Sequence, residues 1–401
     1  MRNLPLAALL LCFLPSLANA QAPPCGGSFN EWLATFRQEA LSQGITKATL
    51  EEAAPLMKVD AAVLSNDRGQ SVFAQTFVEF AARMADGYRL PASKARIKKH
   101  AATFARIERD YGVPAPVIVA FWALETDFGA VMGDTPTIRA LTTLAHDCRR
   151  PELFRPQLLA ALRILQSGDL TLAQMKGPFA GELGQLQFLP THYLDYAVDY
   201  DGDGRRNLIA STPDALASAA NYAVEIGWKR GEPWLQEVRV PSDFAWDQTG
   251  LDIQHPRSQW AQWGVKRIDA GALQADGLSA SLLLPMGRKG PAFLAYPNFL
   301  RVYLEWNKSF VYATTAAYLA TRIGGQPQMT VRAKIPSLSL KEMKTLQEQL
   351  TQRGYEIGKI DGVLGAKTRS AVREEQKKLG LPADSYPTVE LLRALQVADR
   401  R

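Results

Sequence analysis

The sequence predicts a mainly α protein, because helical patterns cover most of the chain and strand patterns are weak. Apolar side chains such as Trp32 and Phe36 recur at helical spacing within residues 26–112. The best strand candidates are the short runs at 235–241 and 281–286. The length of 401 residues suggests two or three domains.

A fully buried helix is expected at residues 113–124, which are apolar on almost every side. Pro114 and Pro116 suit its first turn, where a missing N–H breaks no hydrogen bond. Further helices are predicted at 152–166, 212–227 and 309–322.

Residues 1–20 are predicted to be a cleaved signal peptide. Arg2 is followed by an apolar run at 4–17 and by a small-residue cleavage site at 18–20. The apolar run is too short to span a membrane, and no later stretch approaches the length of a transmembrane helix. We therefore expect a periplasmic protein without stable membrane insertion.

Export determines how the cysteines are interpreted. Cys12 lies within the predicted signal peptide, which leaves Cys25 and Cys148 in the mature chain. Two thiols in an oxidising compartment usually pair, so we expect a disulfide between them. The cysteines lack metal-ligand spacing and the four histidines are dispersed, which argues against a zinc site.

A break at Gly324–Pro327 separates a body, residues 21–324, from a C-terminal unit at 340–401. Residues 325–339 are expected to form a linker. The unit is expected to hold three short helices, one on the apolar stripe from Leu340 to Leu350, one capped by Thr368 and ended by Gly380, and one capped by Thr388.

The formal charge of +6 is spread along the chain without a basic run. This distribution argues against a nucleic-acid partner and suits an anionic polymer such as a cell wall.

Glu125 is the candidate catalytic acid. It ends the predicted buried helix, and burial there raises the pKa of a carboxyl and keeps it protonated near neutrality. A general acid for glycosidic cleavage needs this property. The alternative is a Glu at a helix end that turns into solvent.

Two further motifs allow both a sugar-binding and a structural interpretation. In the glycine-rich segment 179–190, Gln187 is placed to bond a sugar amide or hydroxyl, or the segment is simply a turn between helices. The aromatic and amide residues at 296–299 and 306–313 suit either a sugar groove or a core.

Asp199, Asp201 and Asp203 begin a pattern similar to a calcium loop, with Gly204 at its sixth position. The carboxylate needed at the twelfth position is missing, since Ala210 stands there. We expect no metal site beyond weak structural calcium at this turn, and a turn without metal remains the alternative.

Taken in order, these motifs resemble the membrane-bound lytic transglycosylase B family over about residues 27–324. Residues 340–396 resemble the type 1 peptidoglycan-binding domain. The resemblance implies a lysozyme-like, two-lobed catalytic domain followed by a three-helix wall-binding module. It makes Glu125 the catalytic residue and implies a glycan groove lined by Arg149, Arg150, Gln187, Tyr222, Trp306, Asn307 and Tyr312.

The function implied by this resemblance is non-hydrolytic cleavage of peptidoglycan glycan strands to 1,6-anhydromuramic ends, with no required cofactor. Proteins of wall synthesis or division are candidate partners. A hydrolytic muramidase would need a second carboxylate, and Asp127, two residues along the helix from Glu125, points away. The other alternative, a non-catalytic wall-binding protein, would not need a buried acid.

Overall fold

The computed structural model describes residues 25–69, 75–331 and 335–398, and it confirms the mainly α fold. The predicted signal peptide lies outside these residues. Among the described helices, none is long and apolar enough to cross a membrane.

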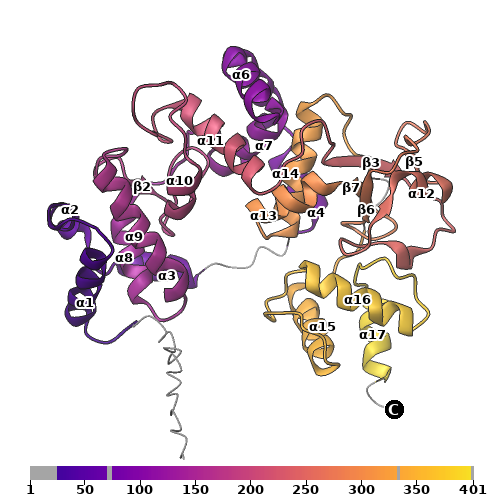
Figure 1. Ribbon diagram of the computed structural model, residues 1–401. Helices are drawn as coiled ribbons and strands as arrows, with labels where there is room; N and C mark the ends of the chain where they lie inside the picture. Colours follow the sequence, from indigo (N-terminus) through magenta and orange to yellow (C-terminus); the bar gives the residue numbers. More distant parts are fainter. Residues whose placement is uncertain (1–24, 70–74, 332–334, 399–401) are drawn as a thin grey trace, which may run out of the picture.

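The N-terminal group of helices is built around the long helix α9. Helix α8 packs against α9, α2 packs against α9, and α3 packs against α8. Figure 1 shows this group on the left of the molecule. The helices are α1 (Phe29–Ser42), α2 (Lys47–Ala53), η1 (Ala54–Leu56), α3 (Ala61–Arg68), α8 (Thr137–His146) and α9 (Pro151–Ser167). A two-residue pair, β1 (Thr135–Pro136) and β2 (Lys176–Gly177), lies beside it.

The central group surrounds the predicted buried helix, which forms α7 (Ala115–Thr126). Helix α14 (Phe310–Ile323) packs along α7, and α10 connects this group to α9. The remaining members are α4 (Phe77–Met84), α5 (Arg89–Lys99), α6 (Ala101–Tyr111), α10 (Pro190–Tyr196), α11 (Thr212–Glu225), η3 (Phe299–Tyr303) and α13 (Leu304–Trp306).

A five-stranded antiparallel sheet, in the order β4-β6-β7-β3-β5, lies beside the central group, where β3 contacts α14. Both strand candidates from the sequence lie in it, as β3 and β6. The sheet has its own core, built around Trp260 and Tyr296. Its elements are β3 (Leu235–Arg239), η2 (Trp246–Gln248), β4 (His255–Pro256), α12 (Arg257–Gln262), β5 (Lys266–Arg267), β6 (Ser279–Leu283) and β7 (Ala292–Ala295).

The C-terminal unit contains α15 (Leu340–Gln352), α16 (Ala366–Lys378) and α17 (Val389–Ala398), as expected. Thr388 caps the third helix by accepting the N–H of Leu391 at 3.2 Å. The predicted cap at Thr368 is wrong, because α16 begins two residues earlier with Gly365 at the N-cap. Thr368 is instead buried within the helix.

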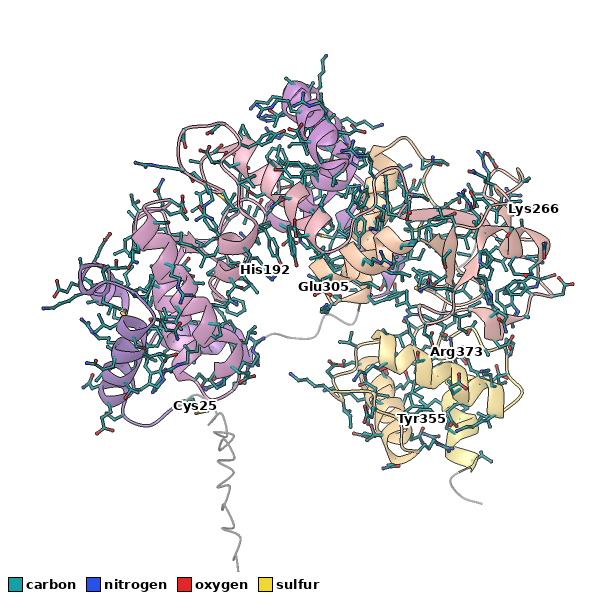
Figure 2. The ribbon with its side chains drawn as sticks, in the orientation of Figure 1. Cys25, His192, Lys266, Glu305, Tyr355 and Arg373 are labelled. Carbon is teal, nitrogen blue, oxygen red and sulfur yellow. A yellow bond between two sulfur atoms is a disulfide. The ribbon has the colours of Figure 1, made fainter. Side chains whose placement is uncertain are left out.

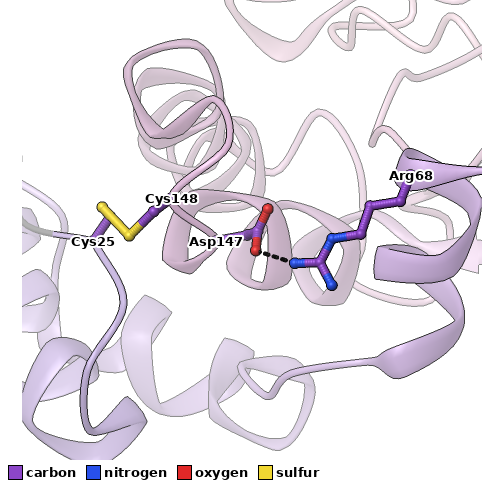
Figure 3. The surroundings of a disulfide bond; sticks show 4 residues. All are labelled: Cys25, Arg68, Asp147 and Cys148. Atoms are coloured by element: carbon purple, nitrogen blue, oxygen red, sulfur yellow. Dashed lines mark hydrogen bonds and ion pairs between the residues drawn. A yellow bond between two sulfur atoms is a disulfide. The ribbon is translucent and has the colours of Figure 1, made fainter.

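The predicted disulfide between Cys25 and Cys148 is present and joins segments 123 residues apart in sequence. It ties the start of the described chain to the loop between α8 and α9. Beside it, Arg68 of α3 donates a 2.6 Å hydrogen bond to Asp147, so a second contact holds the same loop (Figure 3).

Candidate active site

Glu125 is placed by α7, whose residues from Val117 to Ala123 are all buried. Its carboxyl oxygen Oε1 accepts two hydrogen bonds. Trp306 Nε1 donates one at 3.0 Å, and the Tyr312 hydroxyl donates the other. The C-terminal segment of the catalytic body thus orients an acid that lies more than 180 residues earlier.

The surroundings of Glu125 raise its pKa from the ordinary value of 4.5 to about 7. Burial is the largest cause, and the nearby charge of Glu182 adds to it. The hydrogen bonds from Tyr312 and Trp306 act in the opposite direction, because they stabilise the carboxylate. A carboxyl with this pKa can both donate and accept a proton near neutral pH.

The backbone beyond Glu125 turns sharply and is fixed by the glycine-rich segment. Asp127 and Phe128 both have a positive φ, which non-glycine residues rarely adopt. Thr126 donates a 2.6 Å hydrogen bond to the backbone oxygen of Gln185 and accepts the N–H of Gly129 at 2.9 Å. Strained residues of this kind gather at functional sites, where neighbouring structure holds them in place.

Gln187, predicted to contact sugar, also has a positive φ. Its side-chain Nε2 donates to the backbone oxygen of Gly184 at 2.9 Å and lies 3.4 Å from that of Met132. The side chain therefore closes the glycine-rich segment onto the loop after α7.

An aromatic cluster lies against the acid. Trp306 stacks on Phe121 with ring centroids 4.1 Å apart, and Tyr222 lies 5.2 Å from Trp306. His192 extends the cluster at 4.9 Å from Tyr222. Figure 2 shows His192 of α10 and Glu305 of α13 near the middle of the molecule. The sequence interpretation missed Phe121 and His192, because each sits in an apolar or mixed segment that looks like ordinary core.

Arg149 and Arg150 are held together by one buried carboxylate. Arg149 Nε lies 2.7 Å from Asp67 of α3, and Arg150 donates a hydrogen bond to the same side chain. Asp67 is only 1% exposed. Asn307 serves the turn before α14, where its Oδ1 accepts the N–H of Ser309 at 2.9 Å.

Glu182 is a second carboxyl near Glu125 that the sequence interpretation missed. Its Oε2 is buried and has no hydrogen-bond partner among the described residues. Burial raises the pKa of Glu182, and the charge of Arg150 acts against that rise. Its signal in the sequence was weak, since it stands inside a glycine-rich segment.

Asp127 does not face the acid. The Tyr88 hydroxyl donates a 2.5 Å hydrogen bond to Asp127, and Arg89 lies 3.6 Å from the same oxygen. The sequence argument that its side chain points away from the chemistry agrees with these contacts.

The ligand atoms of Asp199, Asp201 and Asp203 lie within 4.8 Å of one another, and all three residues are exposed. Asp214, the carboxylate that follows the missing loop position, is buried and accepts backbone N–H groups from Tyr200, Asp201 and Asn207. The loop is therefore closed by hydrogen bonds to Asp214, which suits at most a loosely held structural cation.

The helical fold, the acid of raised pKa at the end of a buried helix and the aromatic rings beside it define the lysozyme-like class of glycan-cleaving enzymes. Residues 28–321 match the transglycosylase SLT domain family, and residues 339–395 match the peptidoglycan binding domain family. The chain belongs to the transglycosylase SLT domain family.

The relatives are lytic transglycosylases. Membrane-bound lytic murein transglycosylase B of Escherichia coli (strain K12) is 36% identical over 174 residues, which cover 40% of this chain and 48% of that protein. The match thus spans about half the length of this curated relative.

Solved structures match over a larger share of the chain. SltB3 from Pseudomonas aeruginosa, in complex with NAG-anhNAM-pentapeptide, is 41% identical with a TM-score of 0.85, covering 92% of this chain and 100% of that one. Slt35 of Escherichia coli, in complex with calcium, is 26% identical with a TM-score of 0.63, covering 76% of this chain and 97% of that one.

Proposed function

We propose that this chain is a lytic transglycosylase that cleaves the β-1,4 bond between N-acetylmuramic acid and N-acetylglucosamine in peptidoglycan. The observation that supports this most strongly is the Glu125 carboxyl, with its pKa of about 7 and its two hydrogen-bond donors. The SltB3 complex with an anhNAM ligand supports the non-hydrolytic outcome.

In the proposed reaction Glu125 first protonates the glycosidic oxygen, and the bond to the muramic C1 breaks. The Glu125 carboxylate then takes the proton of the C6 hydroxyl of the same muramic residue, and this oxygen attacks C1. The product is a 1,6-anhydro end, and no water is consumed. Tyr312 and Trp306 stabilise the carboxylate between the two steps by hydrogen bonds.

The contacts of the neighbouring carboxyls argue against hydrolysis. A two-carboxylate hydrolase needs an ionised partner to activate water or attack the sugar. Asp127 is engaged by Tyr88 and Arg89. Burial raises the pKa of Glu182, so a smaller fraction of this carboxyl is ionised than in a free Glu, and a hydrolase needs the ionised form of its second carboxylate.

The predicted groove residues divide into two groups in this proposal. Trp306, which is partly exposed, offers aromatic surface beside the acid, and the buried Tyr222 packs near it. Arg149 and Arg150, anchored on Asp67, offer positive charge from the N-terminal helices. Gln187 and Asn307 act by shaping the loops on either side of Glu125.

We further propose that the protein is exported to the periplasm by its first 20 residues and acts in cell-wall turnover. The Cys25–Cys148 disulfide supports an oxidising compartment. The unit at 340–401, after the segment 325–339, is proposed to bind the wall. Calcium at Asp199, Asp201 and Asp203 would serve structure only, because these residues are not part of the acid's surroundings.

Replacing Glu125 with Gln tests the proposed role. The amide preserves shape but cannot donate the proton, so turnover of soluble glycan should fall by about a thousandfold or more, while glycan binding persists. Turnover by mass spectrometry and binding by calorimetry give the two readouts. Undiminished turnover in a folded Glu125→Gln protein would remove this residue from the mechanism.

A further inference from the structure

The C-terminal unit is docked against the catalytic body. Arg369 of α16 donates hydrogen bonds to the backbone oxygens of Pro285 at 2.7 Å and Leu284 at 3.3 Å, just after β6. Arg373, one turn further along α16, pairs with Asp252 at 2.6 Å. Figure 1 shows α16 on the side of the unit that faces the sheet.

One of these contacts reaches the helix that serves the catalytic acid. The Arg369 guanidinium lies 4.3 Å from the centroid of the Phe310 ring, within the range of a cation–π interaction. Phe310 is the first residue of α14 and is buried, with 3% of its surface exposed. Tyr312, two residues later, donates its hydroxyl to Glu125.

The C-terminal unit touches this first turn from more than one direction. Ser309, the N-cap of α14, and Val311 line a small cavity together with Leu364 and Arg369 of the unit. Tyr386 of the unit belongs to the main core of the catalytic body. The first turn of α14 is therefore enclosed partly by the body and partly by the unit.

Packing alone does not explain a buried arginine at this position. Arg369 is largely buried, and its Nε has no hydrogen-bond partner among the described residues. A buried guanidinium costs desolvation energy that a residue such as Leu or Met would avoid. The planar guanidinium can, however, bond two carbonyls at its edge while its face lies over a ring, which fixes one geometry.

We infer that Arg369 is a positioning residue for catalysis, because it fixes Phe310 and the first turn of α14 so that Tyr312 meets Glu125. The C-terminal unit then contributes to turnover itself and not only to wall binding. This inference rests on the proposed function of Glu125.

The test uses the full-length chain with Arg369→Met, compared with Tyr312→Phe. Arg369→Met should loosen the hydrogen bond from Tyr312 to the Glu125 carboxylate, and Tyr312→Phe removes it. Because this bond lowers the pKa of Glu125, that pKa should rise in both variants. On a short soluble glycan, Arg369→Met should lower kcat by about tenfold and change KM by less than about twofold. Arg369→Lys, which keeps the charge, should recover part of kcat.

Two controls separate positioning from stability. Arg373→Met weakens the same interface without contacting Phe310 in the structure, so it should lower Tm while leaving the pKa of Glu125 unchanged. Lys367→Met alters an exposed residue of the same helix and should change neither Tm nor the pKa of Glu125. If Arg369→Met does not fold, Phe310→Leu removes the other partner of the cation–π contact. This variant should show the same loss of kcat and the same rise in the pKa of Glu125.

Titration of the Glu125 carboxyl by ¹³C NMR gives a readout that does not depend on the substrate. An Arg369→Met protein that is less stable but keeps the wild-type kcat and the wild-type Glu125 pKa would overturn the inference. Failure of the proposed function would look different, because the wild type itself would then not produce anhydro ends, whatever the Glu125 pKa in the variants.

Discussion

At the scale of single residues, the proposed chemistry depends on opposed effects on the pKa of Glu125. Burial and the charge of Glu182 favour the protonated acid, while the hydrogen bonds from Tyr312 and Trp306 favour the carboxylate. Their balance gives a pKa of about 7. Turnover needs protonated Glu125 at the start, so it should fall as the pH rises through this value.

Tyr312→Phe should raise the pKa of Glu125, because it removes a donor to the carboxylate. The alkaline limb of the kcat profile should move to higher pH, and kcat at pH 6 should fall by about tenfold to a hundredfold as the carboxylate loses support. Tyr318→Phe is a matched control on the same helix, since its hydroxyl bonds the N–H of Met329 instead. An unchanged pH profile for Tyr312→Phe would contradict this prediction.

Glu182→Gln should have the opposite effect on the profile. Replacing Glu182 with a neutral amide removes the charge that raises the pKa of Glu125, so the alkaline limb should move to lower pH. Glu305→Gln provides a comparison, because Glu305 is an exposed carboxylate whose charge acts on His192 and Tyr222. If both variants shift the limb equally, the effect of Glu182 is not specific.

At the scale of elements, the sequence was informative wherever one pattern decided the structure. The all-apolar run predicted α7, and the helices at 152–166, 212–227 and 309–322 match α9, α11 and α14 within a few residues. Strand β7 was missed because Ala292–Ala295 is a short apolar run without alternation, buried along its whole length.

The site was less predictable than the elements. Motif order pointed to Glu125 and placed Trp306 and Tyr312 in the groove, but only the fold shows that both donate hydrogen bonds to Glu125. Only the fold, likewise, shows that Arg149 and Arg150 share Asp67, which lies on a different helix. Glu182 was overlooked because a glycine-rich segment gives no periodic signal of burial. Long-range pairing of this kind is not encoded in local spacing.

Removing the disulfide should destabilise the N-terminal helices. The Cys25–Cys148 bond closes a loop between residues 123 apart, so Cys25→Ser with Cys148→Ser should cost about 2–5 kcal/mol of unfolding free energy. Chemical denaturation measures the change, and reductant should affect the wild type but not the double variant. If the wild type and the double variant have the same unfolding free energy without reductant, the disulfide contributes nothing to stability.

At the scale of the whole molecule, the acid lies in the helical body, while the sheet and the C-terminal unit pack farther along the chain that carries its donors. The buried cluster of the body runs through both helical groups and includes Tyr386 of the unit, while the sheet and the unit keep smaller cores of their own. This continuity means that the position of α14 depends on parts of the chain on both sides of it. In the proposed mechanism, the chemistry at Glu125 therefore depends on how the whole chain positions α14.

The central claim is that the Glu125 carboxylate accepts the proton of the substrate's own C6 hydroxyl and that no water is consumed. One labelling experiment tests this claim directly. Wall glycan is digested in H₂¹⁸O and the new muramic ends are analysed by mass spectrometry, with Glu125→Gln as the inactive control. We expect 1,6-anhydro ends, lighter by one water than hydrolysed ends and free of ¹⁸O. Reducing muramic ends that carry ¹⁸O as the main product of the wild type would contradict this account and identify a hydrolase.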